Sequence, residues 1–366
     1  MQFGLFYEMY CPLDQLELEP VIIRNTVDQI VHADRHGWDY VWLTEHHFLG
    51  GFSHMSAPEI VFAGAAVQTE HIRFGFGLAL TPPAYNHPVR VAERAAMLDC
   101  LSNGRVDLGS GRSTTPTELY GFGLDPEESR AQWAEGLEAV ARLLGETEVE
   151  LDGEFVKMPP RTVYPRPVQQ PHPPLWVGGV GPGNAERAAK RGLGMLFFAQ
   201  DTKPEALAES IEAYRANIGA ADPFVPGGVN NQTAGFINGL CSYDRDEIRQ
   251  LASRKTVEHT LHGNICMTEG WPNDELPPSY AHVSMVREMR AEIEANGDAM
   301  AEGLLANGFV MAGTPEDCKP VLDAFQEVGV DQVIVHMQMG NVPHERIMES
   351  IELMGKELLP QYHDGA

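Results

Sequence analysis

The chain has 366 residues, of which 43% are hydrophobic, enough apolar material for one large core. A single domain of this length is typical of a barrel. The 52 acidic residues outnumber the 26 basic ones and give a formal charge of −26. This charge repels phosphate backbones and anionic lipids, so nucleic acids and membrane surfaces are poor partners.

The first ten residues lack a basic region followed by a long apolar stretch, and no later run approaches the length of a membrane span. We therefore expect a cytoplasmic protein. The five cysteines are scattered and lack CxxC spacing, which predicts reduced thiols rather than a disulfide framework or a zinc site.

Short β-branched and aromatic runs alternate with amphipathic helical stretches along the chain. Eight strands are expected, at residues 3–7, 40–43, 72–80, 106–110, 175–179, 195–198, 233–242 and 332–337. Helical patterns follow them, for example at residues 21–35, 58–69, 88–101, 185–191, 204–217 and 344–359.

Repeated alternation of strand and helix requires parallel strands, and eight such units close into a (β/α)8 TIM barrel of the α/β class. A doubly wound open sheet is the alternative. We expect residues 1–366 to form one domain, interrupted by insertions at 145–174 and 256–309. Both insertions are expected at the C-terminal mouth of the barrel, where the loops of such enzymes carry the chemistry.

The second strand is followed by Glu45-His46-His47-Phe48. Adjacent side chains on an extended chain point in opposite directions, so one imidazole faces the central cavity and the other packs outward. Histidine transfers protons near neutral pH, whereas the alternative is a hydrogen-bonded core histidine. Two consecutive histidines at the C-terminal end of a strand favour a functional role over a role in core packing.

A metal site is not indicated by the sequence. His32 and His36 are four residues apart on one helix face, a spacing that suits a metal. No third ligand is evident and the helix is expected on the exterior of the barrel, so these two side chains are interpreted as solvated.

Glycines cluster near the C-terminal ends of the third, fourth and fifth expected strands. The third strand contains Gly75 and Gly77, where the backbone either approaches a ligand or forms a packing bulge. Arg112 follows the fourth strand in a glycine- and serine-rich turn, which suits a phosphate but also a surface arginine.

The fifth strand leads through a run of glycines into a helix, a pattern typical of an anion site. This run, residues 178–184, departs from the dinucleotide fingerprint, because Asn184 stands where a glycine is needed. Asp201 lies at a distance suitable for the ribose-binding acid, so the dinucleotide interpretation stays open. The position of the run in a fifth βα unit argues against it.

Several segments together resemble the bacterial luciferase-like flavin monooxygenases, in collinear order over essentially the whole chain. They are the start Met-Gln-Phe-Gly, the run Val-Trp-Leu-Thr-Glu-His-His-Phe, His-Pro-Val-Arg at 87–90, Ser-Asn-Gly-Arg at 102–105 and Gly-Thr-Pro-Glu at 313–316. The resemblance implies a β/α barrel with a non-prolyl cis peptide under the flavin, which by position joins Gly77 to Leu78.

The resemblance also implies roles for individual residues. His46 matches the family's catalytic histidine, Arg112 its arginine on the FMN phosphate, and Glu93 an acid near the flavin ring. The phosphate loop corresponds to Gly179, Val180, Gly181 and Asn184. This chain departs from the luciferase α subunit in having Gly111 in place of a reactive cysteine, Val180 in place of a glutamate and Ala199 in place of a tryptophan.

The implied activity is that of an FMN-dependent monooxygenase. Reduced FMN, supplied by a separate reductase, reacts with oxygen to a flavin hydroperoxide that oxidises a small apolar substrate such as an aldehyde or ketone. His46 manages a proton, the insertion at 256–309 forms a lid, and family habit suggests a homodimer. The alternatives are a deazaflavin-dependent hydride-transfer enzyme on the same fold and a non-catalytic flavin-binding partner subunit.

Overall fold

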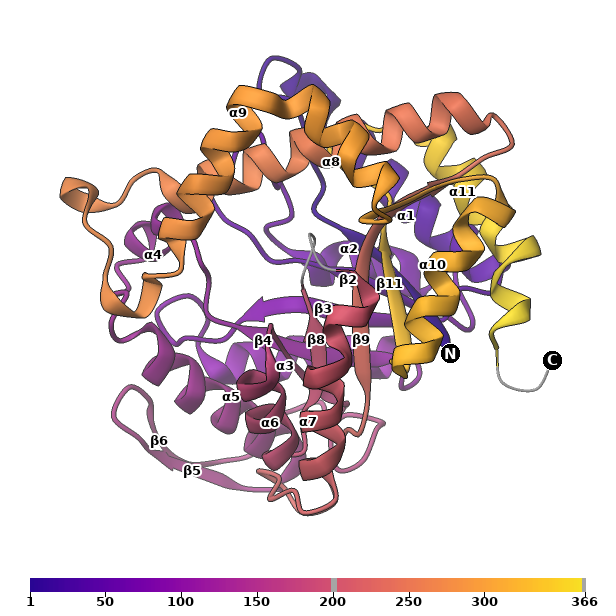
Figure 1. Cartoon of the computed structure of the whole chain (residues 1–366). Helices are drawn as coiled ribbons and strands as arrows, with labels where there is room; N and C mark the ends of the chain where they lie inside the picture. Colours follow the sequence, from indigo (N-terminus) through magenta and orange to yellow (C-terminus); the bar gives the residue numbers. More distant parts are fainter. Residues whose placement is uncertain (199–202, 364–366) are drawn as a thin grey trace.

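The computed structural model describes residues 1–198 and 203–363. Eight parallel strands close into a barrel in the order β9-β11-β1-β2-β3-β4-β7-β8, with β8 pairing back to β9 (Figure 1). The strands are β1 (Gln2–Tyr7), β2 (Tyr40–Leu43), β3 (Arg73–Leu80), β4 (Val106–Gly111), β7 (Leu175–Gly179), β8 (Gly194–Phe197), β9 (Thr233–Cys241) and β11 (Gln332–His336).

The prediction of a (β/α)8 barrel is confirmed, and every expected strand ends within one residue of its observed position. An outer helix follows each barrel strand. These helices are α1 (Glu19–Arg35), α2 (Pro58–Ala66), α3 (Pro88–Leu101), α5 (Ser129–Gly145), α6 (Pro182–Lys190), α7 (Ala208–Ile218), α10 (Pro315–Val328) and α11 (His344–Glu357). Several of these helices begin with proline in the first turn. Backbone N–H groups in the first turn have no acceptor within the helix, so proline, which lacks an N–H, costs no hydrogen bond there.

The insertion at residues 145–174 lies at the opposite end of the barrel from the mouth, so its predicted position was wrong. It forms an antiparallel hairpin of β5 (Val149–Asp152) and β6 (Lys157–Arg161), drawn low in Figure 1 and far from the helices at the top. The following segment packs under the sheet, where Gln169 accepts a hydrogen bond from Arg73 and donates one to the Val106 carbonyl. The reason is topological, because this insertion interrupts a helix-to-strand connection, and such connections lie at the N-terminal ends of the strands.

The second insertion lies at the mouth, as expected, but its first helix starts earlier than residue 256. It contains two long helices, α8 (Arg245–Thr268) and α9 (Val283–Ala306), which cross the top of the barrel (Figure 1). A short strand, β10 (Val310–Gly313), then pairs with β9 outside the closed barrel. We call the segment from α8 to α9 the lid. No helix in the described part of the chain is long and apolar enough to span a membrane.

Aromatic side chains fill the lower interior of the barrel. Trp42 and Trp176 are fully buried there, and each indole N–H has a partner, Gln332 for Trp42 and Asp107 for Trp176. A Cβ atom at Gly75 would overlap the Trp42 ring, so this glycine serves packing. Because the interior is filled, ligands must bind above it, at the mouth.

Candidate active site

His46 lies at the mouth between two buried carboxylates. Its Nδ1 is 3.1 Å from Oε1 of Glu118, and its Nε2 is 3.5 Å from Oε2 of Glu8. Glu8 follows β1 and His46 follows the neighbouring strand β2, so the barrel places them side by side. Glu118 comes from a short helix after β4, α4 (Pro116–Gly121).

Glu118 is held ionised by four donors. Its Oε1 accepts from His46 and from the backbone N–H of His47, and its Oε2 accepts from the hydroxyls of Ser113 and Thr115. Burial alone raises the pKa of this carboxyl, but the attraction of His46 and the hydrogen bonds outweigh it and lower the pKa to about 2. Glu118 therefore carries a negative charge at every pH of interest.

The charge of Glu118 in turn favours protonated His46. Burial lowers the pKa of the imidazole, but attraction to Glu118 and then to Glu8 dominates and raises that pKa to about 9. Glu8 behaves differently, because burial raises its pKa, and the attraction of His46 and the hydrogen bond from Thr44 only partly compensate. At neutral pH His46 is thus an imidazolium fixed by Glu118, with its Nε2 directed to a carboxyl that accepts a proton readily.

The second imidazole of the pair points elsewhere, as strand geometry predicts. His47 Nε2 lies 3.1 Å from Oε1 of Glu45, and its ring packs against Phe122. Glu45 also accepts hydrogen bonds from the backbone of Leu80 and from Asn86. This pair ties the end of β2 to the end of β3, and His46 alone faces the two buried acids.

The lid adds a second, uncharged histidine cluster to the mouth. His259 of α8 is fully buried, stacks on Phe52 at 5.0 Å between centroids and contacts His336 at the end of β11. Burial lowers the pKa of His259 to about 3 and that of His336 well below its usual value, so both rings are neutral. Both nitrogens of His259 and Nε2 of His336 lack a hydrogen-bond partner among the described residues. Phe52 also contacts His46, which joins this cluster to the charged one.

The expected non-prolyl cis peptide is present between Gly77 and Leu78. The Leu78 side chain packs over glycines of the next two strands, because Cβ atoms at Gly111 and Gly178 would lie 3.0 and 2.8 Å from it. The register of β3 against β4 shifts at this point. The glycines at these strand ends therefore leave room for the Leu78 side chain.

Arg112 and Gly179, where the loop before α6 begins, lie at the same level of two neighbouring strands. Each comes two residues after a member of the strand pair Ser110 and Val177. The guanidinium donates to the Ser129 hydroxyl and the Ser279 carbonyl and lies 4.5 Å from the Tyr280 ring, so it is held partly by the lid.

The loop formed by Gly179, Val180, Gly181 and Asn184 leaves the start of α6 open. Gly181 is the residue before the helix, has a φ of 80° and provides no side-chain cap. The amide of Asn184 donates to the Val180 carbonyl, which fixes the loop, and Val180 is itself exposed. An uncapped helix start close to an arginine suits an anionic group.

One expected site residue lies elsewhere. Glu93 lies on the outer helix α3, forms an ion pair with Arg90 and lines a surface pocket of about 410 Å³ with Met97 and Tyr164. The structure does not bring Glu93 together with His46 and Arg112. Ala199 and Asp201 lie outside the described residues.

The sequence interpretation missed Glu8, Glu118, His259 and His336. Glu118 is concealed because Thr115 and Glu118 have the spacing of an ordinary helix cap, and Thr115 does accept from the Glu118 N–H. Glu8 was detectable, since it is the first residue after a barrel strand. His259 gives no local signal, because only the fold of the lid brings it over the mouth.

Comparisons with known proteins show which family this chain resembles over its whole length. The oxygenase component of a flavin-dependent trigonelline monooxygenase from Acinetobacter baylyi is 26% identical over 368 residues, covering 100% of this chain and 96% of that protein. A 5,10-methylenetetrahydromethanopterin reductase from Archaeoglobus fulgidus is 26% identical, covering 90% of this chain and 93% of its own length. The crystal structure of monooxygenase RslO1 from Streptomyces bottropensis superposes with a TM-score of 0.79 at 26% identity, covering 99% of this chain and 100% of that one. The sequence profile of the luciferase-like monooxygenases matches residues 1–332, and the chain therefore belongs to the luciferase-like monooxygenase family.

Proposed function

We propose that this protein is the oxygenase of a two-component FMN-dependent monooxygenase that oxidises a small apolar substrate. The observation that carries the proposal is the imidazolium of His46 held between Glu8 and Glu118 at the mouth of a luciferase-like barrel. A protonated, positioned histidine next to a carboxyl of raised pKa is equipped for proton transfer. A non-catalytic partner subunit would have no need to maintain such a group.

Arg112 and the open start of α6 fit the phosphate of FMN. A guanidinium has five N–H donors, and the described contacts of Arg112 engage two of its nitrogens. The glycines around the helix start leave backbone N–H groups accessible. Reduced FMN, when bound, supplies the activation of oxygen, and the protein supplies orientation and exclusion of water.

His46 acts as the proton donor in this proposal. Glu118 fixes the ring through Nδ1, which leaves Nε2 to protonate an oxygen of the reacting group. Glu8, 3.5 Å from Nε2, holds the next proton and returns it to the imidazole. Ser53 and Thr44 keep Glu8 in place by donating to its backbone carbonyl and its carboxyl, respectively.

The walls of the mouth favour an apolar substrate such as an aldehyde or ketone. Phe52 lies between His46 and His259, and Phe6 and Phe236 pack around His336. Neutral imidazoles there provide hydrogen bonds without a charge. The lid contributes His259 and the backbone that holds Arg112, so its position controls access of water to the site.

A separate reductase is proposed as the source of reduced flavin, as the description of the Acinetobacter relative as an oxygenase component suggests. The purified chain with FMN is then expected to oxidise NADH and NADPH at a negligible rate. Useful oxidation by the chain alone would contradict this part of the proposal. The homodimer remains a proposal based on family habit, which light scattering tests.

The decisive experiment mixes the protein anaerobically with reduced FMN and then with oxygenated buffer in a stopped-flow instrument. A monooxygenase should give a long-lived absorbing species distinct from reduced and oxidised flavin, and an accepted substrate should shorten its life. A screen of aldehydes and ketones with a generic flavin reductase then identifies substrates by oxygen consumed per reductant. Rapid conversion directly to oxidised flavin in every case would contradict the proposal.

The second candidate is a deazaflavin-dependent hydride transfer, favoured by the similarity to the Archaeoglobus reductase. Tight binding of coenzyme F420 in preference to FMN, with turnover under strictly anaerobic conditions, would select it. His46→Ala tests the proton-transfer role of His46, since this variant should retain FMN binding and lose product formation. His71→Ala, which removes a histidine whose side chain is 80% exposed, is the matched control and should leave both unchanged.

A further inference from the structure

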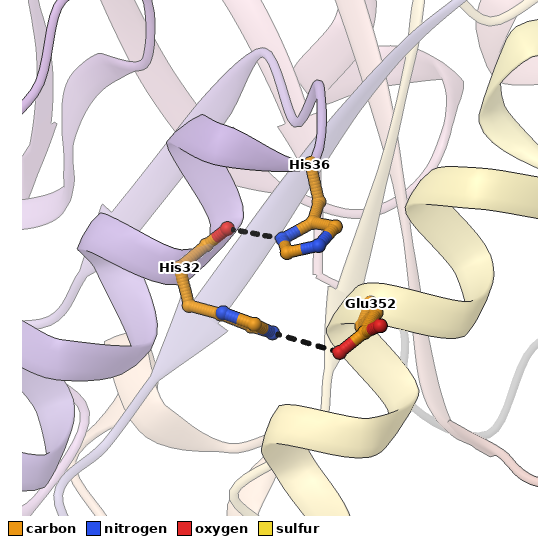
Figure 2. Close-up of side chains that lie close together, drawn as sticks. All are labelled: His32, His36 and Glu352. Atoms are coloured by element: carbon orange, nitrogen blue, oxygen red, sulfur yellow. Dashed lines mark hydrogen bonds and ion pairs between the residues drawn. The ribbon is translucent and has the colours of Figure 1, made fainter.

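His32 and His36, which the sequence left without a third ligand, meet a carboxylate from the far end of the chain. Figure 2 shows the imidazoles of His32, on α1, and of His36, directly after α1, facing Glu352 of α11. One potential ligand atom from each of the three residues lies within 4.8 Å of the others, and His32 Nε2 is 3.8 Å from Glu352 Oε2. We propose that these three side chains bind a divalent transition metal ion, Zn²⁺ by preference.

Both imidazoles are oriented as metal ligands usually are. His36 donates from Nδ1 to the backbone carbonyl of His32 at 2.8 Å, which leaves Nε2 as its free ring nitrogen (Figure 2). The Nε2 atom of His32 is buried and has no hydrogen-bond partner among residues 1–198 and 203–363. Histidines that bind metals typically donate their other ring N–H to a carbonyl or carboxylate, as His36 does.

Glu352 divides its two oxygens between different partners. Oε1 forms an ion pair with Lys356, one turn further along α11, and Oε2 faces His32. Two neutral imidazoles and one carboxylate oxygen suit Zn²⁺ better than Mg²⁺ or Ca²⁺, which prefer oxygen ligands only. Zn–N bonds are about 2.0–2.1 Å long, so small rotations of these half-buried side chains would bring the three atoms onto one ion. A fourth position stays open to water.

The ion would join the first and last helices of the barrel. α1 and α11 already meet through Gln29 and His344, whose side-chain nitrogens are 2.9 Å apart. The cluster lies on the outer helices, away from His46 and Arg112, so its role is to hold the closure of the barrel rather than to take part in the oxidation. This proposal is independent of the proposed monooxygenase activity.

The test measures Zn²⁺ binding by the full-length protein after removal of metals with a chelator. Isothermal titration should show one Zn²⁺ per chain, and thermal unfolding should shift upward by a few degrees at a hundredfold excess over Kd. His36→Ala and Glu352→Gln should each weaken binding at least tenfold and abolish the thermal shift. Lys356→Gln should strengthen binding severalfold, because it removes the competitor for the Glu352 carboxylate. Absorption spectra with Co²⁺ in place of Zn²⁺ should report imidazole nitrogen ligands.

The matched control is His71→Ala, an exposed histidine beside Glu70 that is outside the cluster. It should retain the wild-type affinity. Circular dichroism of each variant without metal verifies that the fold is intact, and Glu352→Gln keeps the shape of the side chain. Unchanged Zn²⁺ affinity in His36→Ala and Glu352→Gln, or no binding below millimolar Zn²⁺, would overturn the proposal.

Discussion

Replacing Glu118 by Gln removes the charge that holds His46 protonated while keeping the shape of the side chain. The pKa of His46 is raised from 6.5 to about 9, which corresponds to roughly 3 kcal/mol of preference for the imidazolium. Glu118 contributes to this preference both by its charge and by its hydrogen bond to Nδ1, and Glu8 contributes less. In Glu118→Gln the pKa of His46 should therefore fall by at least about one pH unit.

Nuclear magnetic resonance of protein labelled with ¹³C-histidine measures this pKa directly, with the His46 signal assigned by its absence from His46→Gln. Turnover should follow the same group. Product formation by the wild-type enzyme should decline as pH rises through about 9, and in Glu118→Gln the decline should begin at lower pH.

The same pair makes stability depend on pH in a defined window. The stabilisation from Glu118, whose pKa is lowered from 4.5, is complete above 4.5 and is lost as pH falls through about 2. The stabilisation from His46, whose pKa is raised, is complete below 6.5 and is lost as pH rises through about 9. The difference in unfolding free energy between wild type and Glu118→Gln should thus be largest between pH 4.5 and 6.5 and smaller at pH 10.

Glu135→Gln is the control, because the Glu135 carboxylate accepts from the backbone of residues 154–156 at the other end of the barrel. It should lower stability without moving the pKa of His46. A His46 pKa that stays near 9 in Glu118→Gln would refute the assignment of Glu118 as the source of the charge.

Three further predictions concern the cofactor site, the lid and the packing of the barrel. Arg112→Ala should weaken FMN binding by about 10- to 100-fold and leave riboflavin binding nearly unchanged, as measured by fluorescence titration. The control variant Arg161→Ala, on the distant hairpin, should change the affinity for neither ligand. Equal losses of affinity for FMN and riboflavin in Arg112→Ala would contradict a role in phosphate binding. His259→Phe should keep the stacking on Phe52 and the melting temperature but reduce product formed per flavin oxidised, and unchanged coupling would remove His259 from the site. Gly109→Ala should lower the free energy of unfolding in urea by about 2 kcal/mol or more, because its Cβ would overlap the Phe76 carbonyl. Gly303→Ala on α9 should raise the free energy of unfolding by up to about 1 kcal/mol, because its Cβ would meet nothing within 4 Å.

The barrel was predictable because each of its strands is a short apolar run bounded by turns, and parallel strands leave few alternative topologies. His46 and Arg112 could also be predicted from the sequence, because each follows one of these strands. Glu118 was not, because its contacts to Ser113 and Thr115 look like local capping until the fold brings His46 to the same carboxylate. The length of the hairpin insertion predicts a position at the mouth. Its place between a helix and the following strand instead puts it at the N-terminal ends of the strands.

Glu352 illustrates a further limit of single-sequence reasoning. It is separated from His36 by almost the whole chain, and only closure of the barrel makes α1 and α11 neighbours. Spacing along one helix identified two potential ligands, whereas the third depended on a contact between distant segments. Long-range pairs of this kind carry no periodic signal.

Arg112 connects the proposed phosphate site to the lid. Its guanidinium already bonds to the Ser279 carbonyl and lies against Tyr280, both in the lid, as well as to Ser129 beneath. A phosphate that draws on the same guanidinium changes the free energy of the lid's position. If FMN binds there as proposed, a second ligand that shifts the lid changes the affinity for FMN, and FMN changes the affinity for that ligand by the same factor. In the proposed enzyme, cofactor binding and the position of the lid are therefore coupled through Arg112.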